Sequence, residues 1–510
     1  MGKTLTRRDF LKLTGLFSGH FALSSILRTR DPEILPQPGK KNILIVVFDA
    51  FSAYHLSIHG YARETTPNIT RLAQRAIVYH NHFSAGNFTA PGTASLLTGT
   101  LPWTHRAIQM DKPVVSSMAN KSIFHVFDDY YRIAYSHNPL AITYLDQFMG
   151  DLDDYVALED LFLTNDGLIQ KLFHKDDNTS SLSWMRTIKK DVNGGYSYSL
   201  FMSNLYERIL SRRIAPFREL FPNGLPRVRG DNYFILEDAI DFLGDRLIQI
   251  PNPFLAYFHF FPPHEPYSAH RDFVDYFRND SFQPLIKPVD LFGGGRRRTP
   301  YLLAKFRQQY DEYILYLDRE FGRFYDQLSK SGLLENTWLI LTSDHGELFE
   351  RAIWEHTTPV LFQPVVRVPL IVFEPGRSSR LDIHLPTSAV DVLPTLLQIG
   401  GKKPVDWTEG VVLPPFAITT QNTARSLYAI EAKHNNPSLP LTNATIMLVK
   451  GRYKLTNFFG YEALEGGERT ELFDIEHDPE ELDNLFSIKS ALAKELLSEL
   501  KATLRNMDQP

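Results

Sequence analysis

Two carboxylates and an imidazole stand directly after strongly apolar segments. Asp49 closes the run NILIVVFD at 42–49, and Asp344 and His345 follow the run NTWLILTS at 336–343. Such runs are typical of strands buried on both faces of a parallel sheet, whose carboxyl ends collect ligands. Two carboxylates and one imidazole together suit a divalent cation. A helix-capping role for Asp49 and a surface role for His345 remain open at this point.

The segment NFTAPGTASLLTG at 87–99 contains a hydroxyl with two possible roles. Pro91 suits a first helical position and Gly99 a helix end, so the segment predicts a helix with Thr89 at or just before its start. Unpaired N–H groups and the helix dipole favour negative charge there. Thr89 is therefore either an N-cap or a hydroxyl placed to become a nucleophile.

Several histidines form a second group of candidates. The aromatic-rich run PFLAYFHFF at 253–261 predicts a strand that leads into a turn carrying His264, and His356 stands in WEHTTPV at 354–360. His264 is a candidate general acid, whereas His356 could equally be a solvated helix residue. His259, His105 and Arg106 are weaker candidates, for which we expect structural roles.

Composition excludes several classes of function. The 510 residues include 54 Lys+Arg and 59 Asp+Glu, a net charge of -5, so no basic surface argues for a nucleic-acid partner. With Cys 0, the chain has no disulfide, no thiolate metal site and no cysteine nucleophile. The chemistry must therefore use oxygen and nitrogen atoms.

The N-terminus predicts export. Arg7 and Arg8 precede a short apolar stretch in residues 1–30, as in a twin-arginine signal, and the stretch is too short and too polar for a stable transmembrane anchor. A basic amphipathic surface helix is the alternative. A proline-rich linker at 31–41 would follow. We therefore expect the twin-arginine machinery as a partner and a periplasmic or otherwise exported protein.

The order of further segments resembles the sulfatase family of the alkaline phosphatase superfamily. The matching stretches, between residues 42 and 486, are NILIVVFDA, YARETTPNITRLA, TAPGTASLLTG, PPHEPY, SDHGE, VRVPLIVF, SAVDVLPTLLQIGG, RYKLTNFF and ELFDIEHDPEELDNL. The resemblance implies a three-layer α/β domain with a mainly parallel sheet over 42–410. A small C-terminal α+β domain with an antiparallel sheet over 411–510 would follow.

The resemblance also implies roles for individual residues. One divalent ion (Mn, Zn, Ca or Mg) would bind Asp49, Thr89, Asp344 and His345. Thr89 would be the nucleophile and His264 the acid for the leaving group. His356 would contact the transferred group, and an anionic ester would be the substrate.

Three departures from the family pattern qualify this expectation. Sulfatases carry a cysteine or serine, which matures to formylglycine, where Thr89 stands; Thr93 replaces an arginine, and Ala50 replaces a second aspartate. An unmodified threonine resembles the nucleophile of phosphoethanolamine and phosphoglycerol transferases. We expect an exported metal-dependent hydrolase of phosphate mono- or diesters, phosphonate esters or sulfate esters. The alternatives are such a transferase and an inactive anion-binding relative. Residues 120–250 and a basic loop near Arg296 would set specificity.

Overall fold

The computed structural model describes residues 39–110, 112–156, 161–163, 208–228, 232–290, 292, 297–417, 425–464 and 466–507. The predicted export signal at 1–30, most of the linker at 31–41, Arg296 and much of the segment at 120–250 lie outside these ranges. None of the helices inside them combines the length and apolar character needed to cross a membrane. The export signal and the oligomeric state therefore stay outside the structural description.

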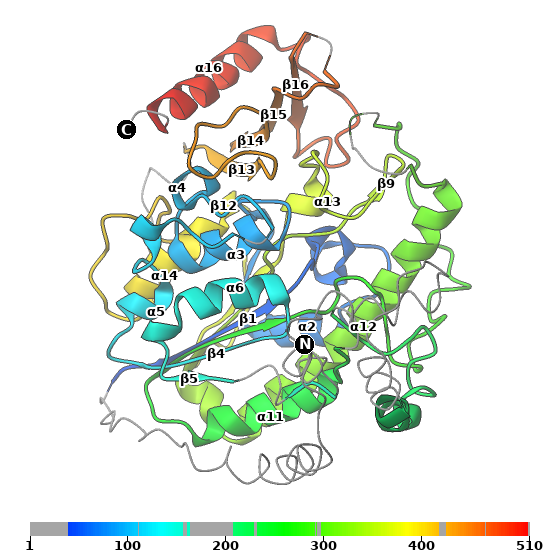
Figure 1. Cartoon of the computed structure of the whole chain (residues 1–510), viewed down its shortest axis with the longest axis vertical. Coiled ribbons are helices and arrows are strands. Elements are labelled where there is room, and N and C mark those ends of the chain that lie inside the picture. The colour runs from blue at the N-terminus through cyan, green and yellow to red at the C-terminus, as the bar shows by residue number, and fades with distance from the viewer. Residues whose placement is uncertain are drawn as a thin grey trace, which may run out of the picture.

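A mainly parallel sheet forms the centre of the molecule (Figure 1). Strand β1 (Asn42–Phe48) pairs in parallel with β6 (Phe254–Phe260) and with β7 (Thr337–Thr342). Within the described residues the sheet has eight strands in the order β11-β2-β10-β7-β1-β6-β4-β5. The other strands are β2 (Ile77–Tyr79), β4 (Tyr131–Ser136), β5 (Asp154–Tyr155), β10 (Leu370–Phe373) and β11 (Leu381–Ile383). Only β10 runs antiparallel to its neighbours here.

Helices cover both faces of this sheet, because alternate side chains of each central strand point to opposite sides. From β1, Leu44, Val46 and Phe48 enter the core on one face, and Ile43, Ile45 and Val47 enter the core on the other. The first core includes residues of α2 (Pro67–Leu72), α11 (Leu236–Gln249) and α12 (Pro300–Lys330). The second includes residues of α3 (Thr89–Thr98), α5 (Ile123–Val126), α6 (Pro139–Gln147) and α14 (Val392–Ile399). The predicted three-layer α/β architecture is confirmed.

Helix α3 begins two residues earlier than Pro91 suggested. Thr89 is its first residue, and the helix ends before Gly99, whose φ of 68° is left-handed. Proline is tolerated anywhere in the first turn, because the N–H groups there have no partner within the helix. The threonine therefore lies inside the helix rather than ahead of it.

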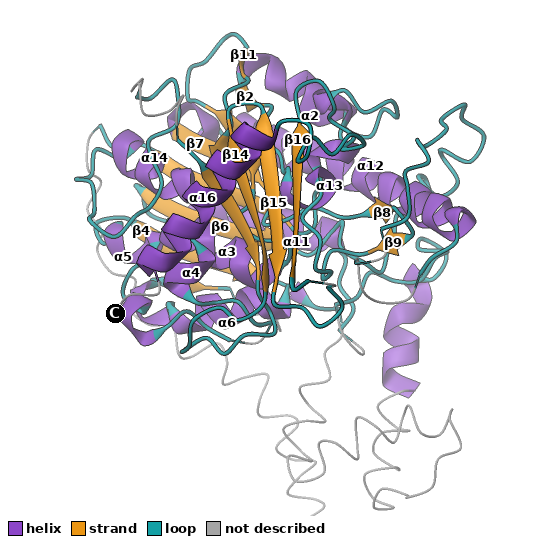
Figure 2. Ribbon diagram, turned by 90° about the horizontal axis from the view of Figure 1, so that it is seen from above, coloured by secondary structure: helices purple, strands orange, loops and turns teal. Residues whose placement is uncertain are grey.

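A separate antiparallel sheet follows near the C-terminus (Figure 2). Strands β13 (Leu427–Glu431), β14 (Ala444–Lys450), β15 (Tyr453–Phe459) and β16 (Glu468–Asp474) pair in sequence order. The amphipathic helix α16 (Ser490–Met507) contacts β15. The small antiparallel sheet predicted here is thus confirmed, whereas the boundary at 410/411 remains a prediction.

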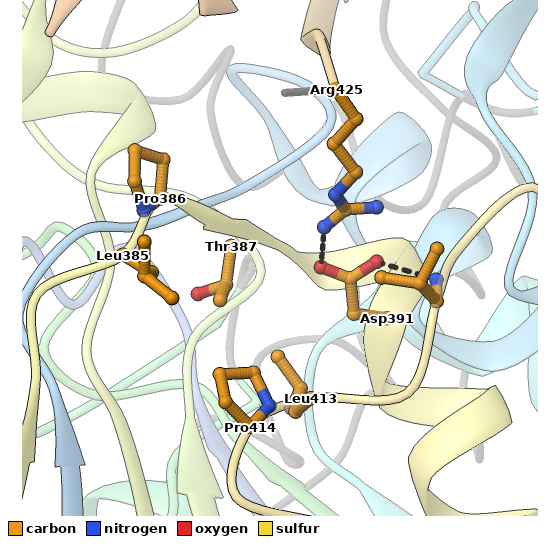
Figure 3. A pocket seen from close by; sticks show the side chains of 8 residues that line it. Leu385, Pro386, Thr387, Asp391, Leu413, Pro414 and Arg425 are labelled. Atoms are coloured by element: carbon orange, nitrogen blue, oxygen red, sulfur yellow. Dashed lines mark hydrogen bonds and ion pairs between the residues drawn. The ribbon is translucent and has the colours of Figure 1, made fainter. Parts of the chain in front are cut away.

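Short elements connect these parts. They are β3 (His82–Phe83), α4 (Pro102–His105), β8 (Phe349–Glu350), β9 (Ile353–Trp354), α13 (Gln363–Val366) and β12 (Thr387–Ser388). One polar joint is visible in Figure 3, where Arg425 meets the buried carboxylate of Asp391. That carboxylate also accepts hydrogen bonds from the backbone N–H groups of Ser388 and Val411. Asp391 thereby holds the start of α14 to the chain that leads into β13.

Candidate active site

Three of the four predicted metal ligands meet at the carboxyl edge of the central sheet. Asp49 follows β1, and Asp344 and His345 follow the adjacent parallel strand β7. His345 Nε2 lies 3.1 Å from Asp49 Oδ1 and 3.7 Å from Asp344 Oδ2. One ligand atom from each residue lies within 4.8 Å of the other two, and all three side chains are buried. Residues separated by about 295 positions in the chain thus form one cluster because their strands are neighbours.

Two oxygen atoms of this cluster fit a missing cation. Asp49 Oδ1 and Asp344 Oδ2 are buried, and in the described part of the chain they face only imidazole nitrogens of His345 and His259, at 3.1 to 3.7 Å, with no well-aligned hydrogen bond. A buried carboxylate oxygen without a partner is costly, so such atoms are normally paired or bound to metal. Two carboxylates, an imidazole and the nearby Thr89 hydroxyl form a donor set suited to Mg²⁺, Mn²⁺, Ca²⁺ or Zn²⁺.

The same geometry shifts the pKa of each group. Burial lowers the pKa of an imidazole, but Asp344 and Asp49 outweigh burial and raise the pKa of His345 to about 9. Burial opposes ionisation of Asp49, yet the facing His264 and His345 lower its pKa well below the ordinary value. Burial, aided by Asp49, raises the pKa of Asp344. In the absence of a metal, His345 is therefore the proton carrier of the cluster.

Close packing sets the position of the loop that carries Asp344. A Cβ atom added to Gly92 would lie 2.1 Å from the backbone oxygen of Asp344, so only glycine allows the first turn of α3 to approach. The Ser84 hydroxyl donates a hydrogen bond to the same oxygen. Ser343 Oγ accepts a hydrogen bond from the N–H of Phe51 at 2.9 Å and joins the ends of β1 and β7. The ligands are thus held by backbone contacts as well as by strand pairing.

Thr89 lies beside the cluster at the first position of α3. Its Oγ1 is 3.4 Å from His345 Nε2, and the side chain is buried. Phe88 occupies the N-cap position, so the capping interpretation of Thr89 does not hold. The hydroxyl instead combines a position next to the carboxylates with the positive end of a helix dipole, as a nucleophile that becomes an alkoxide requires.

Asn138 joins Thr89 to Asp49, and sequence reasoning missed it. Its Nδ2 donates to Asp49 Oδ2 and lies 3.3 Å from Thr89 Oγ1. Its Oδ1 accepts the N–H of Leu140 at 2.7 Å, which makes Asn138 the N-cap of α6. The usable signal was an asparagine directly before Pro139, after the apolar run that forms β4. This signal is weak on its own, because the surrounding segment carries few other motifs.

The predicted histidines His264 and His356 lie next to each other and next to the cluster. The His356 ring centroid is 4.2 Å from that of His345 and 5.0 Å from that of His264. His264 donates through Nδ1 to the backbone oxygen of Glu265 at 2.7 Å. His356 is buried, which contradicts its alternative interpretation as a solvated helix residue. Both imidazoles therefore border the cluster of Asp49, Asp344 and His345.

Glu347 is a second residue that sequence reasoning missed as a site residue, although it ends the SDHGE motif. The buried carboxylate lies 3.3 Å from His356 Nδ1 through both of its oxygens and also accepts from Tyr267 Oη at 3.3 Å. Burial raises the pKa of Glu347 to about 7, and burial together with His345 lowers the pKa of His356 well below its ordinary value. A proton on His356 Nδ1 directed at Glu347 leaves Nε2 as the other functional atom of the ring.

The three weaker histidine and arginine candidates separate into two kinds. His259 Nε2 lies 3.6 Å from Asp344 Oδ2, and its Nδ1 is 3.1 Å from Tyr257 Oη, so it belongs to the surroundings of the site. His105 instead bonds Ser95 Oγ at 2.9 Å, and Arg106 donates to the backbone oxygens of Pro437 and Leu439. These last two residues are structural.

Among the described residues, no arginine or lysine forms an ion pair with the two carboxylates of the cluster. Across the described residues, Asp49 and Asp344 have ion-pair contacts only with His259 and His345. Thr93, which stands where the family has an arginine, is fully buried near Tyr257. The positive charge next to the two carboxylates therefore comes from histidines, from the N-terminus of α3 and from a bound cation, whereas Lys433 lies further out, beside His356, where it donates to the backbone oxygen of Thr357.

The sheet order and the layers are those of an alkaline-phosphatase-like fold. This chain belongs to the sulfatase family, whose profile, described as Sulfatase, matches residues 41–402. A second profile, described as N-sulphoglucosamine sulphohydrolase, C-terminal, matches residues 355–509. The predicted family and the predicted enzyme class, a sulfatase-like ester hydrolase, are confirmed.

Individual relatives agree with this membership. The chain is 25% identical over 477 residues to a choline-sulfatase of Rhizobium meliloti, covering 88% of this chain and 82% of that protein. It is 23% identical over 499 residues to an arylsulfatase of Clostridium perfringens, covering 91% and 94%. A phosphonate monoester hydrolase of Agrobacterium radiobacter has the same fold, with a TM-score of 0.65, 19% identity and coverage of 92% and 96%. Sulfatases use a divalent metal, for which Asp49, Asp344 and His345 offer a possible site here.

Proposed function

We propose that this protein is an exported, metal-dependent hydrolase that cleaves sulfate esters, phosphonate esters or phosphodiesters through Thr89. The observation that carries the proposal is the position of the Thr89 hydroxyl. It lies at the N-terminus of α3, 3.4 Å from His345 Nε2, beside the buried carboxylates of Asp49 and Asp344. A divalent ion, when bound, would lower the pKa of the hydroxyl and balance the charge of the carboxylates.

The reaction would proceed by two displacements at phosphorus or sulfur. Thr89 Oγ1 loses its proton to solvent and attacks in line, so that a bond from Oγ1 forms as the bond to the leaving oxygen breaks. The N–H groups of α3 face the oxygen atoms of the transferred group. His264 gives a proton to the departing oxygen, and His356 Nε2 hydrogen-bonds the transferred group. Water then gives a proton to His264 and attacks the same centre, the bond to Oγ1 breaks, and Thr89 regains its proton from solvent.

Electrostatics favour substrates with a single negative charge. The site has two carboxylates, and no lysine or arginine pairs with them in the described ranges. A divalent ion would only balance these carboxylates. A phosphate monoester carries a charge of about −1.5 to −2 near neutrality. Sulfate esters, phosphodiesters and phosphonate monoesters carry one, which a protonated histidine and the helix dipole can offset. Of the ester classes expected from the sequence, phosphate monoesters are therefore the poorest expected substrates.

A substrate panel tests the proposal. We expect kcat/KM for p-nitrophenyl sulfate, p-nitrophenyl phenylphosphonate or bis(p-nitrophenyl) phosphate to exceed that for p-nitrophenyl phosphate by at least about tenfold, a difference of about 1.4 kcal/mol. The metal-loaded protein is measured beside Thr89→Ala as the matched inactive control. Turnover of the phosphate monoester alone would contradict the charge argument. Metal-loaded protein that turns over none of the esters would favour the inactive anion-binding alternative.

A transferase is the alternative function, because an unmodified threonine resembles the nucleophile of the phosphoethanolamine and phosphoglycerol transferases. In a transferase, an acceptor alcohol rather than water would take the group from Thr89. Product analysis in the presence of glycerol or ethanolamine distinguishes the two, because a hydrolase yields the free acid at the same rate as in their absence. Export is tested separately, by the cellular location of the protein.

A further inference from the structure

A second cavity lies behind the turn that carries Asp49. It has a volume of about 420 Å³, and its walls include Tyr54, His55 and Tyr61. Tyr310 separates it from the candidate active site. The Tyr310 hydroxyl contacts Ala50 and Ser52 in the turn after Asp49, whereas its ring packs on His55 with ring centroids 5.0 Å apart. None of the residues proposed for catalysis or metal binding lines this cavity.

The cations of this cavity are unevenly paired. Lys287 forms ion pairs with Glu350 at 2.8 Å and with Glu480 at 2.6 Å, and all three residues line the cavity. Arg307 from α12 and Arg367, the residue after α13, line it too. Neither guanidinium has an acidic group within ion-pair distance in the part of the chain that the structure describes. Lys287 thus pairs with both glutamates of the cavity. The guanidinium groups of Arg307 and Arg367 therefore remain able to bind another anion.

The hydrogen bonds of Arg307 are also incomplete, whereas the guanidinium of Arg367 additionally contacts Tyr54, 5.5 Å from its ring centroid. Arg307 donates through one terminal nitrogen to the backbone oxygen of Phe349 at 2.9 Å, but its buried Nε has no acceptor among the described residues. Arg367 donates through Nε to the backbone oxygen of His80 at 2.8 Å, and burial lowers its pKa. Burying a charged group without a counter-ion is costly. An anion bound in the cavity would lower this cost for each arginine that it contacts.

We propose that this cavity is a second binding site, for an organic molecule that carries a sulfate, phosphate or carboxylate group. The planar guanidinium of arginine is suited to paired hydrogen bonds with such oxyanions. Tyr61, Phe282 and Phe349 offer apolar surface for the rest of the molecule. The volume lies in the range of small-molecule sites, which is larger than an inorganic oxyanion needs.

Calorimetric titration with p-toluenesulfonate tests this site. The full chain carrying Asp344→Asn is used, so that metal-dependent binding at the candidate active site does not contribute. We expect one saturable site in this background. Arg307→Gln or Arg367→Gln should weaken binding about 10- to 100-fold, the effect of losing a hydrogen bond to a charged group. Lys305→Gln, an exposed residue of the same helix, is the matched control and should leave binding unchanged.

Binding to Arg307→Lys and binding of inorganic sulfate test the site further. Arg307→Lys retains the charge, so it should bind more tightly than Arg307→Gln, and circular dichroism checks that each variant folds. Inorganic sulfate should bind more weakly than the sulfonate, because it lacks the apolar part. Absence of saturable binding, or binding that both arginine substitutions leave intact, would overturn the proposal. Equal affinity for sulfate and sulfonate would contradict its organic component.

Discussion

Metal affinity should depend steeply on pH, because the ion and a proton compete for His345. The two carboxylates beside His345 raise its pKa to about 9, and only the neutral imidazole can bind a metal. The imidazole of His345 is charged below its pKa in the folded protein, so the affinity for the metal ion rises with pH up to about 9. At pH 7, two units lower, about one imidazole in a hundred is neutral. The apparent affinity should then be about 100-fold below its high-pH limit, about 2.7 kcal/mol.

Competition between the apo-protein and a chelator for Mn²⁺ measures this dependence. Between pH 6.5 and pH 8.5 the logarithm of the dissociation constant should fall by about one per pH unit. About one proton should leave per ion bound at pH 7. The raised pKa of Asp344 acts in the same direction, so it can only steepen the slope. His125→Ala, in a half-exposed side chain, should follow the same line, whereas His345→Ala should lose most binding. A flat profile in the unmodified protein would refute the assignment of His345 as proton carrier and ligand.

Three other outcomes are expected. Glu347→Gln removes the carboxylate that faces His356 Nδ1, so kcat should fall about 10- to 100-fold while metal content stays unchanged; a loss of metal instead would assign Glu347 to the metal site. Asp318→Ala removes an acceptor for the first N–H groups of α2, so the free energy of unfolding, measured in urea, should fall by about 1–2 kcal/mol. The control Asp326→Ala, at an exposed position of the same helix, should lower it by no more than about 0.5 kcal/mol. Arg7→Lys with Arg8→Lys should retain the protein in the cytoplasm, and fractionation that finds it exported would refute the twin-arginine interpretation.

The parts of the site that sequence predicted are those encoded locally. Asp49 and the Asp344–His345 pair each end an unbroken apolar run, and a parallel sheet brings the ends of adjacent strands together. The position of Thr89 could be read from its proline and glycine neighbours. The error of two residues at the start of α3 arose because proline fits more than one position of a first turn.

The parts that sequence reasoning missed depend on contacts between distant segments. Asn138 reaches Asp49 only because β4 pairs with β6, which in turn pairs with β1. Glu347 matters because the chain returns to place His356 against it, a contact that no local spacing encodes. Arg307 and Arg367 likewise need the structure, because only the tertiary packing shows that neither has an acidic partner among the described residues of the second cavity. Side chains whose role depends on tertiary packing therefore need the structure.

The most direct test of the central claim is the mass of the Thr89 peptide after acid quench. Metal-loaded protein mixed with p-nitrophenyl phenylphosphonate should carry the transferred phenylphosphonyl group on Thr89, at a level that rises before steady turnover. Thr89→Ser should form the same adduct and retain part of the rate, and Thr89→Ala should form none and lose several orders of magnitude in kcat while keeping most of its metal. An unlabelled Thr89 peptide together with full activity of Thr89→Ala would contradict the account.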